Sequence, residues 1–315
     1  MEVQDKPKIT TPYINLQSDY GFKRLFGTEE FRGALLQFLS AVLGDDIKIT
    51  DVEFHDKEIL PESEEGKKIV YDVYCTMTVP SGDSSLKRRH LKRMDKDKGV
   101  PHHFILEMQN IYEPPFEDRM LYYTSKIVSS QGYSGWNYDL DPVVLMAVTD
   151  FDFSFLTPSL MQDFRISERT TGEVLTDKFR MLFFSLRQVP DEWEDCKNEI
   201  QRLLYLIKNM DKLDKTSKPY LEGGYEKIFE AAESNRLVAE DVVLYSQSLD
   251  RIRAYQAGID YAAEQSMEKG IEIGREQEKV NTAKILIMMN QEDEFISQAT
   301  GLTIEKIRSI RNTLD

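Results

Sequence analysis

Two acidic residues stand inside segments that otherwise have the composition of buried β-strands. Residues 69–79 carry Asp72, and residues 103–111 carry Glu107 and, two positions later, Gln109. Alternate residues of a strand share a face, so Glu107 and Gln109 point the same way. If the two strands pair, both carboxylates and the amide converge, and an unpaired buried carboxylate costs several kcal/mol. A bound cation removes that cost, and an all-oxygen ligand set favours Mg²⁺.

A simpler interpretation needs no metal ion. Asp72 then pairs with Arg119 or another cation at a sheet edge, and Glu107 lies on a solvated face. Structural ion pairs perturb acidic groups as strongly as active sites do. Strand spacing alone leaves both interpretations open.

The order of periodic segments predicts a mixed α/β domain. Ser18 can cap a short helix that Gly27 stops, and Thr28 can cap a second helix that ends at Gly44. Further segments are read from β-branched alternation or from helical spacing. They are three strands at 49–59, 69–79 and 103–111, a helix at 116–130, a buried strand at 142–149, and two strands within 164–186. The core order is therefore α-β-β-β-α-β.

Helical periodicity dominates after Pro190. Residues 265–279 are highly charged and read as a solvated helix, and residues 293–314 have the outline of a small helix-turn-helix. We therefore expect a polar lead over 1–17, a catalytic-type domain over 18–189, a helical region over 190–264 and a charged helix with its tail over 265–315. The tail carries few basic residues, so oligomer contact is at least as good an expectation for it as DNA contact.

Composition limits the classes of function. A formal charge of −15 argues against a protein that coats nucleic acid, although a local basic patch can still hold phosphates. No stretch is long and apolar enough to cross a bilayer, and the start is polar, so we expect a cytoplasmic protein without membrane contact. The two cysteines lack metal-ligand spacing and predict buried thiols.

A basic cluster interrupts the two acidic strands. The segment 81–99 contains Lys87, Arg88, Arg89, Lys92 and Arg93. In so acidic a chain, this segment could clamp a phosphate backbone beside the carboxylates. The alternative is a charged, disordered loop.

Several of these segments together resemble a known family. Residues 19–27 (DYGFKRLFG), 69–75 (IVYDVYC), 104–110 (FILEMQN) and 119–123 (RMLYY) are similar to the Rpn recombination-promoting nucleases, also described as PD-(D/E)xK nuclease family transposases. Matches continue to about residue 152. The resemblance implies a restriction-endonuclease-like mixed sheet flanked by helices, followed by a mostly helical C-terminal region. It also implies hydrolysis of DNA with Mg²⁺, for which Mn²⁺ can substitute.

The resemblance also assigns roles to individual residues. Asp72 matches the motif aspartate and Glu107 the second acidic residue, both metal ligands, while Gln109 stands where the wider superfamily has lysine. An amide can orient water but brings no charge, so Lys126 on the following helix is a candidate substitute, or else a solvated lysine. Asp19 belongs to the N-terminal motif and either lies near the metal or stabilises its own helix terminus.

Three functions remain in view. The first is an Mg²⁺-dependent DNA endonuclease associated with recombination or mobile elements. The second is a catalytically inactive binding or regulatory protein on the same scaffold, which the acidic charge and the neutral Gln109 favour. The third is an RNA-directed nuclease with the same site. A homo-oligomer formed through the C-terminal helices is compatible with each of them.

Overall fold

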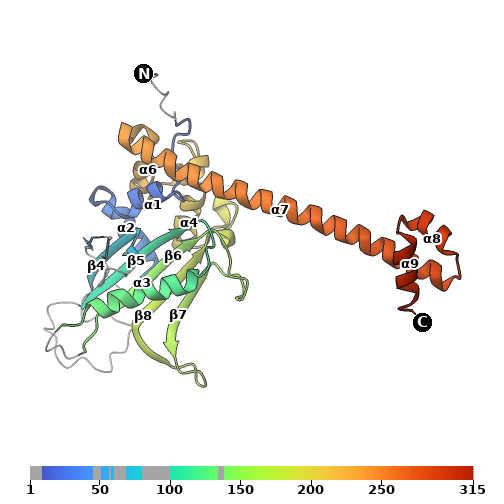
Figure 1. The fold of residues 1–315 in the computed structure, drawn as a ribbon. Helices are drawn as coiled ribbons and strands as arrows, with labels where there is room; N and C mark the ends of the chain where they lie inside the picture. The colour runs from blue at the N-terminus through green and yellow to red at the C-terminus, as the bar shows by residue number, and fades with distance from the viewer. Residues whose placement is uncertain are drawn as a thin grey trace, which may run out of the picture. The chain divides into compact units, whose positions relative to one another are not determined.

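The computed structural model describes residues 9–44, 51–56, 58–59, 69–79, 100–133 and 138–314 (Figure 1). The predicted basic clamp at residues 87–93 lies outside the described residues. It therefore stays a prediction.

A mixed six-stranded sheet forms the centre of the first part of the chain. In spatial order its strands are β1 (Glu53–Phe54), β4 (Val73–Val79), β5 (Val100–Gln109), β6 (Val143–Thr149), β8 (Val174–Ser185) and β7 (Met161–Ser167). The pairs β5/β6 and β6/β8 are parallel, whereas the pairs toward both edges are antiparallel. The predicted mixed α/β class with strands flanked by helices is confirmed.

The second predicted strand, 69–79, is wrong as a single element. β3 (Ile69–Val70) pairs with β2 (Glu58–Ile59) in a separate two-stranded sheet, and the chain bends at Asp72 before β4 begins. The reason lies in the hydrogen bonds at the bend. The amide of Asp72 donates to a side chain of β5 instead of to a strand carbonyl. Asp72 therefore leads into β4 without belonging to it.

Helix α1 (Asp19–Phe26) begins as predicted, because Ser18 Oγ accepts a hydrogen bond from the amide of Gly21 at 3.0 Å. The predicted Thr28 cap is wrong. Its hydroxyl donates back to the carbonyl of Arg24, and a 3₁₀ turn, η1 (Glu29–Phe31), precedes α2 (Arg32–Leu43).

The two faces of the sheet carry separate cores because strand residues alternate. On one face, α3 (Phe116–Ser130) places Phe116, Met120 and Ile127 against Ile105 and its neighbours. On the other face, α1 and α2 pack against residues that include Leu106 and Met108. Glu107 and Gln109 have the parity of Ile105 and so lie on the α3 face.

Residues 186–252 add short helices to the core on the α1 face. They are η2 (Leu186–Gln188), η3 (Trp193–Asp195), α4 (Glu199–Asn209), η4 (Met210–Lys212), α5 (Lys218–Glu222), α6 (Glu226–Ala232), η5 (Ser234–Arg236) and the start of α7 (Ala239–Met288). Side chains of α4 and α6 belong to the same buried cluster as those of α1. The contact pattern accordingly groups the chain up to Ile252 into one compact unit.

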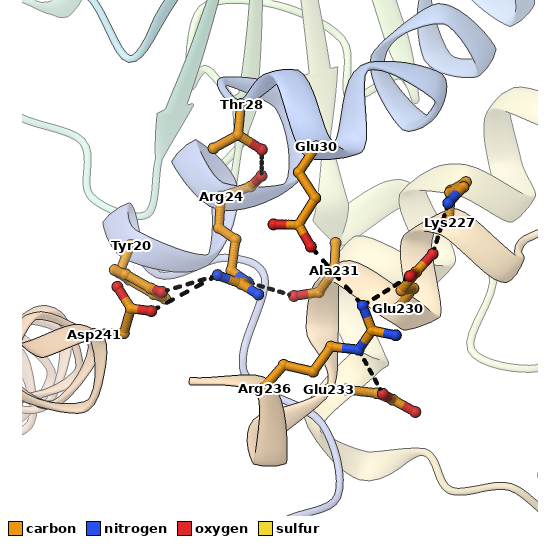
Figure 2. Close-up of polar contacts among 10 residues, drawn as sticks. All are labelled: Tyr20, Arg24, Thr28, Glu30, Lys227, Glu230, Ala231, Glu233, Arg236 and Asp241. Atoms are coloured by element: carbon orange, nitrogen blue, oxygen red, sulfur yellow. Dashed lines mark hydrogen bonds and ion pairs between the residues drawn. The ribbon is translucent and has the colours of Figure 1, made fainter. Parts of the chain in front are cut away.

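Arg24 of α1 and Arg236 of η5 join these helices to the N-terminal part of the fold (Figure 2). Arg24 donates to the carbonyl of Ala231 at 2.9 Å and also faces Asp241 of α7. Arg236 contacts Glu230 at 2.7 Å and Glu233 at 2.9 Å. Arg24 thus joins α1 to a segment about 200 residues away. Arg236 bridges its own short turn and also lies 3.8 Å from Glu30 of η1.

Residues 253–315 form a second unit. The remainder of α7 is helical and mostly exposed, and α8 (Asp293–Thr300) and α9 (Ile304–Arg311) close a small core around Ile287, Ile296 and Ile307. Gly301 joins them with a φ of 71°, a left-handed conformation that favours glycine. Among the described helices, none has the length and apolar character needed to cross a membrane.

Candidate metal centre

Asp72 and Glu107 lie against each other at the bend before β4. The amide of Asp72 donates to Oε1 of Glu107 at 3.3 Å, and the amide of Met108 donates to Oδ2 of Asp72 at 2.9 Å. Each acid thus accepts a backbone hydrogen bond from the other segment. The same two hydrogen bonds therefore accompany the bend at Asp72 and hold both carboxylates in place.

Both carboxylates are withdrawn from solvent. Glu107 is 3% exposed, and the side chain of Asp72 is 13% exposed. Burial raises the pKa of Glu107 well above its usual value, and the nearby charge of Asp72 raises it further. Burial also raises the pKa of Asp72, against the opposing effect of Lys23 and the Met108 amide. Two neighbouring acids therefore both have pKa values raised above those of free carboxyl groups.

Lys23 brings a positive charge from α1 to this pair. Its Nζ lies 3.2 Å from Oδ1 of Asp72 and 2.5 Å from Oδ1 of Asp19, one helical turn earlier. Asp19 also contributes to the raised pKa of Asp72. Asp19 therefore lies both at the N-terminus of its helix and close to the acidic pair, so the two predicted roles are compatible.

The N-terminal segment is held so that Lys23 reaches Asp72. Asn110, just after β5, donates from Nδ2 to the carbonyl of Gln17 at 2.7 Å. A Cβ atom on Gly21 would lie 2.2 Å from the carbonyl oxygen of Asn15, so only glycine fits that close approach. Both contacts fix where α1 begins relative to the end of β5.

Gln109 connects Glu107 to a second cation. Its Nε2 donates to Oε2 of Glu107 at 3.3 Å, and its Oε1 accepts from Nη2 of Arg119 on α3 at 2.5 Å. The alternative expectation that Asp72 pairs with Arg119 or another cation holds in its second form, because Lys23 is that cation, whereas its other part, a solvated Glu107, does not hold. Sequence reasoning missed Arg119 as a neighbour of Gln109. The available signal was that Arg119 belongs to the segment 119–123, one of the segments that carry the family resemblance.

Lys126, the predicted substitute for the missing motif lysine, is half-buried on α3. It follows Arg119 by two helical turns, which places its backbone about 10 Å further along the helix axis. Its catalytic assignment stays a prediction. Arg119 is the α3 cation that contacts Gln109.

The residues fit a divalent ion with few protein ligands. In the described part of the chain, no group of three or more histidine, cysteine or acidic side chains is arranged to hold a metal. Asp72 and Glu107 nevertheless offer carboxylate oxygens at one point, where a dication would offset both the burial and the mutual repulsion. Mg²⁺ commonly uses one or two carboxylates and keeps water or phosphate on its remaining positions.

Comparison with known proteins shows the family of the chain. The family model of the PD-(D/E)XK nuclease family transposases matches residues 16–80 and 94–262. Searches of curated proteins and of solved structures each found no match. The matched residues include both acids, Gln109 and the two cations, and they cover most of the chain. The chain belongs to the PD-(D/E)XK nuclease family transposases.

Proposed function

We propose that this protein is an Mg²⁺-dependent endonuclease that hydrolyses phosphodiester bonds of DNA, in association with recombination or mobile elements. The observation that carries the proposal is the buried pair of Asp72 and Glu107, whose pKa values are both raised. The chain belongs to a family of nucleases, and this supports phosphodiester hydrolysis as the class of reaction. A buried acidic pair without a catalytic or metal-binding purpose is a costly arrangement.

The charges around the pair support a phosphate substrate. Asp19, Asp72 and Glu107 bring three negative charges when ionised, and Lys23 and Arg119 bring two positive ones. Arg119 also pairs with Glu113, so these six groups carry a net charge of −2, which a bound dication would bring to 0. A singly charged phosphodiester is repelled by the first state and is not repelled by the second.

In this proposal Asp72 and Glu107 hold the metal, and Gln109 holds the attacking water in place. When bound, the ion acts as a Lewis acid toward the phosphate and lowers the pKa of coordinated water. The chain's own groups then position the reactants. Lys23 orients Asp72 through its 3.2 Å contact, and Gln109 orients Glu107.

One observation favours the alternative of a catalytically inactive scaffold. Lys23 already neutralises Asp72, and the motif position of the superfamily's lysine holds the uncharged Gln109. A chain that keeps the fold and replaces the metal by an internal ion pair would bind partners without hydrolysis. An RNA substrate would use the same residues as DNA.

Nicking of supercoiled plasmid in Mg²⁺ tests the proposal directly. Wild type is compared with Asp72→Asn, Glu107→Gln and the control Asp163→Asn, which removes a carboxylate on the edge strand β7. We expect nicking by wild type and the control, and a loss of at least about 100-fold in the two site variants. Equal nicking by all four proteins would refute the active-site assignment, and no nicking by any would favour the scaffold.

We also propose that residues after Gln265 mediate self-association. Exposed apolar side chains on this part of α7, such as Met267 and Ile273, support the idea. Removal of residues 266–315 should then lower the oligomeric mass in sedimentation. An unchanged mass would refute this role.

A further inference from the structure

Arg119 is held in a fixed orientation beside the acidic pair. Its Nη2 donates to Gln109 at 2.5 Å, its Nη1 donates to Glu113 at 3.2 Å, and its guanidinium lies 5.7 Å from the centre of the Phe116 ring. Its side chain is 27% exposed. An arginine with three separate supports loses little conformational freedom when it binds a ligand.

The guanidinium also has a hydrogen-bond donor to spare. Nε of Arg119 is buried, and in the described structure it has no hydrogen-bond partner. Buried donors without partners are uncommon in folded proteins and carry a desolvation penalty. Nε itself is covered, but the guanidinium is partly exposed and Nη1 and Nη2 each carry a second N–H, so these donors can bind two oxygens of one phosphate.

The side chain of Gln109 links Arg119 to Glu107 of the acidic pair. An arginine can only donate hydrogen bonds, and an ionised carboxylate can only accept them. The two groups must therefore contact different atoms of the Gln109 amide. The amide presents its oxygen to Arg119 and its nitrogen to Glu107. A lysine at position 109 would instead place a second positive charge beside Arg119.

We propose that Arg119 binds the substrate phosphate and that the pair Gln109–Arg119 supplies the positive charge that a single motif lysine supplies elsewhere in the superfamily. The inference rests on the proposed function, since it places nucleic-acid phosphate at this site. It differs from the assignment of Lys126, because it rests on the contact between Arg119 and Gln109. It also differs from the basic clamp, because Arg119 lies on α3, within the described residues.

The first measurement is binding of a fluorescent duplex DNA, followed by anisotropy over a range of salt concentrations in Ca²⁺, so that a dication offsets the acidic pair as in the metal-bound state. We expect Arg119→Gln to weaken binding about ten-fold and to reduce the slope of log affinity against log salt by about 0.9, the value for one phosphate contact. Arg119→Lys should keep most of the slope, because the charge remains. Arg165→Gln is the matched control, since Arg165 is similarly exposed at 30% but pairs with Asp163 on β7.

The second measurement is plasmid nicking with a rescue. Arg119→Gln should lower kcat while the Mg²⁺-induced rise in Tm stays as in wild type, because Asp72 and Glu107 are intact. Adding Gln109→Lys to Arg119→Gln should restore part of the nicking and of the salt slope. A purely structural role of Arg119 gives no reason for such a rescue.

The outcomes separate this inference from the proposed function. If wild type does not nick DNA but Arg119→Gln still loses about one phosphate contact, the inference stands and the catalytic proposal fails. If Arg119→Gln binds and nicks as Arg165→Gln does, the inference is overturned, whatever the Asp72 and Glu107 variants show. Wild type that binds no DNA at any salt concentration also overturns it.

Discussion

The amide of Asp72 donates a hydrogen bond to the carboxylate of Glu107, so the two acids of the site are joined through the main chain as well as by proximity. An N–H donor stabilises the ionised form of Glu107, yet burial and the charge of Asp72 outweigh it. The metal-free site is therefore under electrostatic stress that a suitable cation relieves.

Glu107→Gln should stabilise the metal-free protein at pH 8. The raised pKa means that folded Glu107 keeps a proton which the unfolded chain releases above about pH 4.3. Stability of wild type in EDTA therefore falls as pH rises from that value toward the raised pKa, and glutamine removes this dependence. Chemical unfolding at pH 5 and pH 8 measures it. Parallel pH profiles of wild type and variant would contradict the expectation.

Mg²⁺ should raise the Tm of wild type and should not change the Tm of Glu107→Gln. Binding to the folded state alone contributes about 2.7 kcal/mol at a ligand concentration of 100 times Kd. Removal of the ion with EDTA should reverse the rise. A rise of equal size in the variant would place the binding site elsewhere.

Lys23→Met should weaken the metal-free fold and strengthen metal binding. Loss of Lys23 leaves Asp72 without its cationic partner, at a cost of about 1–2 kcal/mol after allowance for partial exposure. The same change removes a charge that repels and competes with a dication. Calorimetric titration with Mg²⁺ measures the second effect. The control is Lys218→Met, which removes an exposed ion pair with Glu194 and should leave both stability and metal binding as in wild type. Weaker metal binding by Lys23→Met would contradict the expectation that Lys23 competes with the metal ion.

Gly21→Ala should destabilise the protein by about 1–3 kcal/mol or more. The added Cβ would lie 2.2 Å from the Asn15 carbonyl oxygen, a backbone atom that cannot move freely. Gly33→Ala is the matched control, because its Cβ would lie 3.6 Å from Lys227 in a helix. We expect that control to stabilise by about 0.5–1 kcal/mol. Similar unfolding midpoints for the two variants would disprove the close approach.

Acid should destabilise the fold through His103. Burial lowers the pKa of His103 to about 4, with smaller effects from His55 and His102, and its Nδ1 lies 2.8 Å from the hydroxyl of Tyr74. The unfolded chain takes up the proton below about pH 6.5 and the folded chain only near pH 4, so stability falls between these values. His103→Gln in the Glu107→Gln background should flatten this loss. An unchanged loss from pH 7 to pH 5 would exclude His103 as its cause.

Some of the site follows from strand alternation alone. The parity of Glu107 and Gln109, together with the apolar residues around them, places both on one face of β5. The bend at Asp72 could not be read from the sequence, since it depends on side-chain hydrogen bonds between two chain segments. β-Branched residues on both sides of Asp72 predict a continuous strand.

The two cations show a different limit. Arg119 contacts Gln109 because α3 begins at Phe116 and directs its first turn toward the end of β5. Lys23 reaches Asp72 because α1 docks against segments more than 80 residues away. Local periodicity predicts each helix, and packing between helices decides which charged group meets the acids.

The helices that follow the sheet bear on how the protein can be dissected. Side chains of α4 and α6 fill the core beneath α1, and Ile14 donates its amide to the carbonyl of Ala232. A fragment that stops at residue 189 would expose that apolar surface and release the segment that carries Lys23. Expression trials for a minimal fragment that contains the acidic pair should therefore keep the chain to at least Ile252, even though the strands and both acids are complete much earlier.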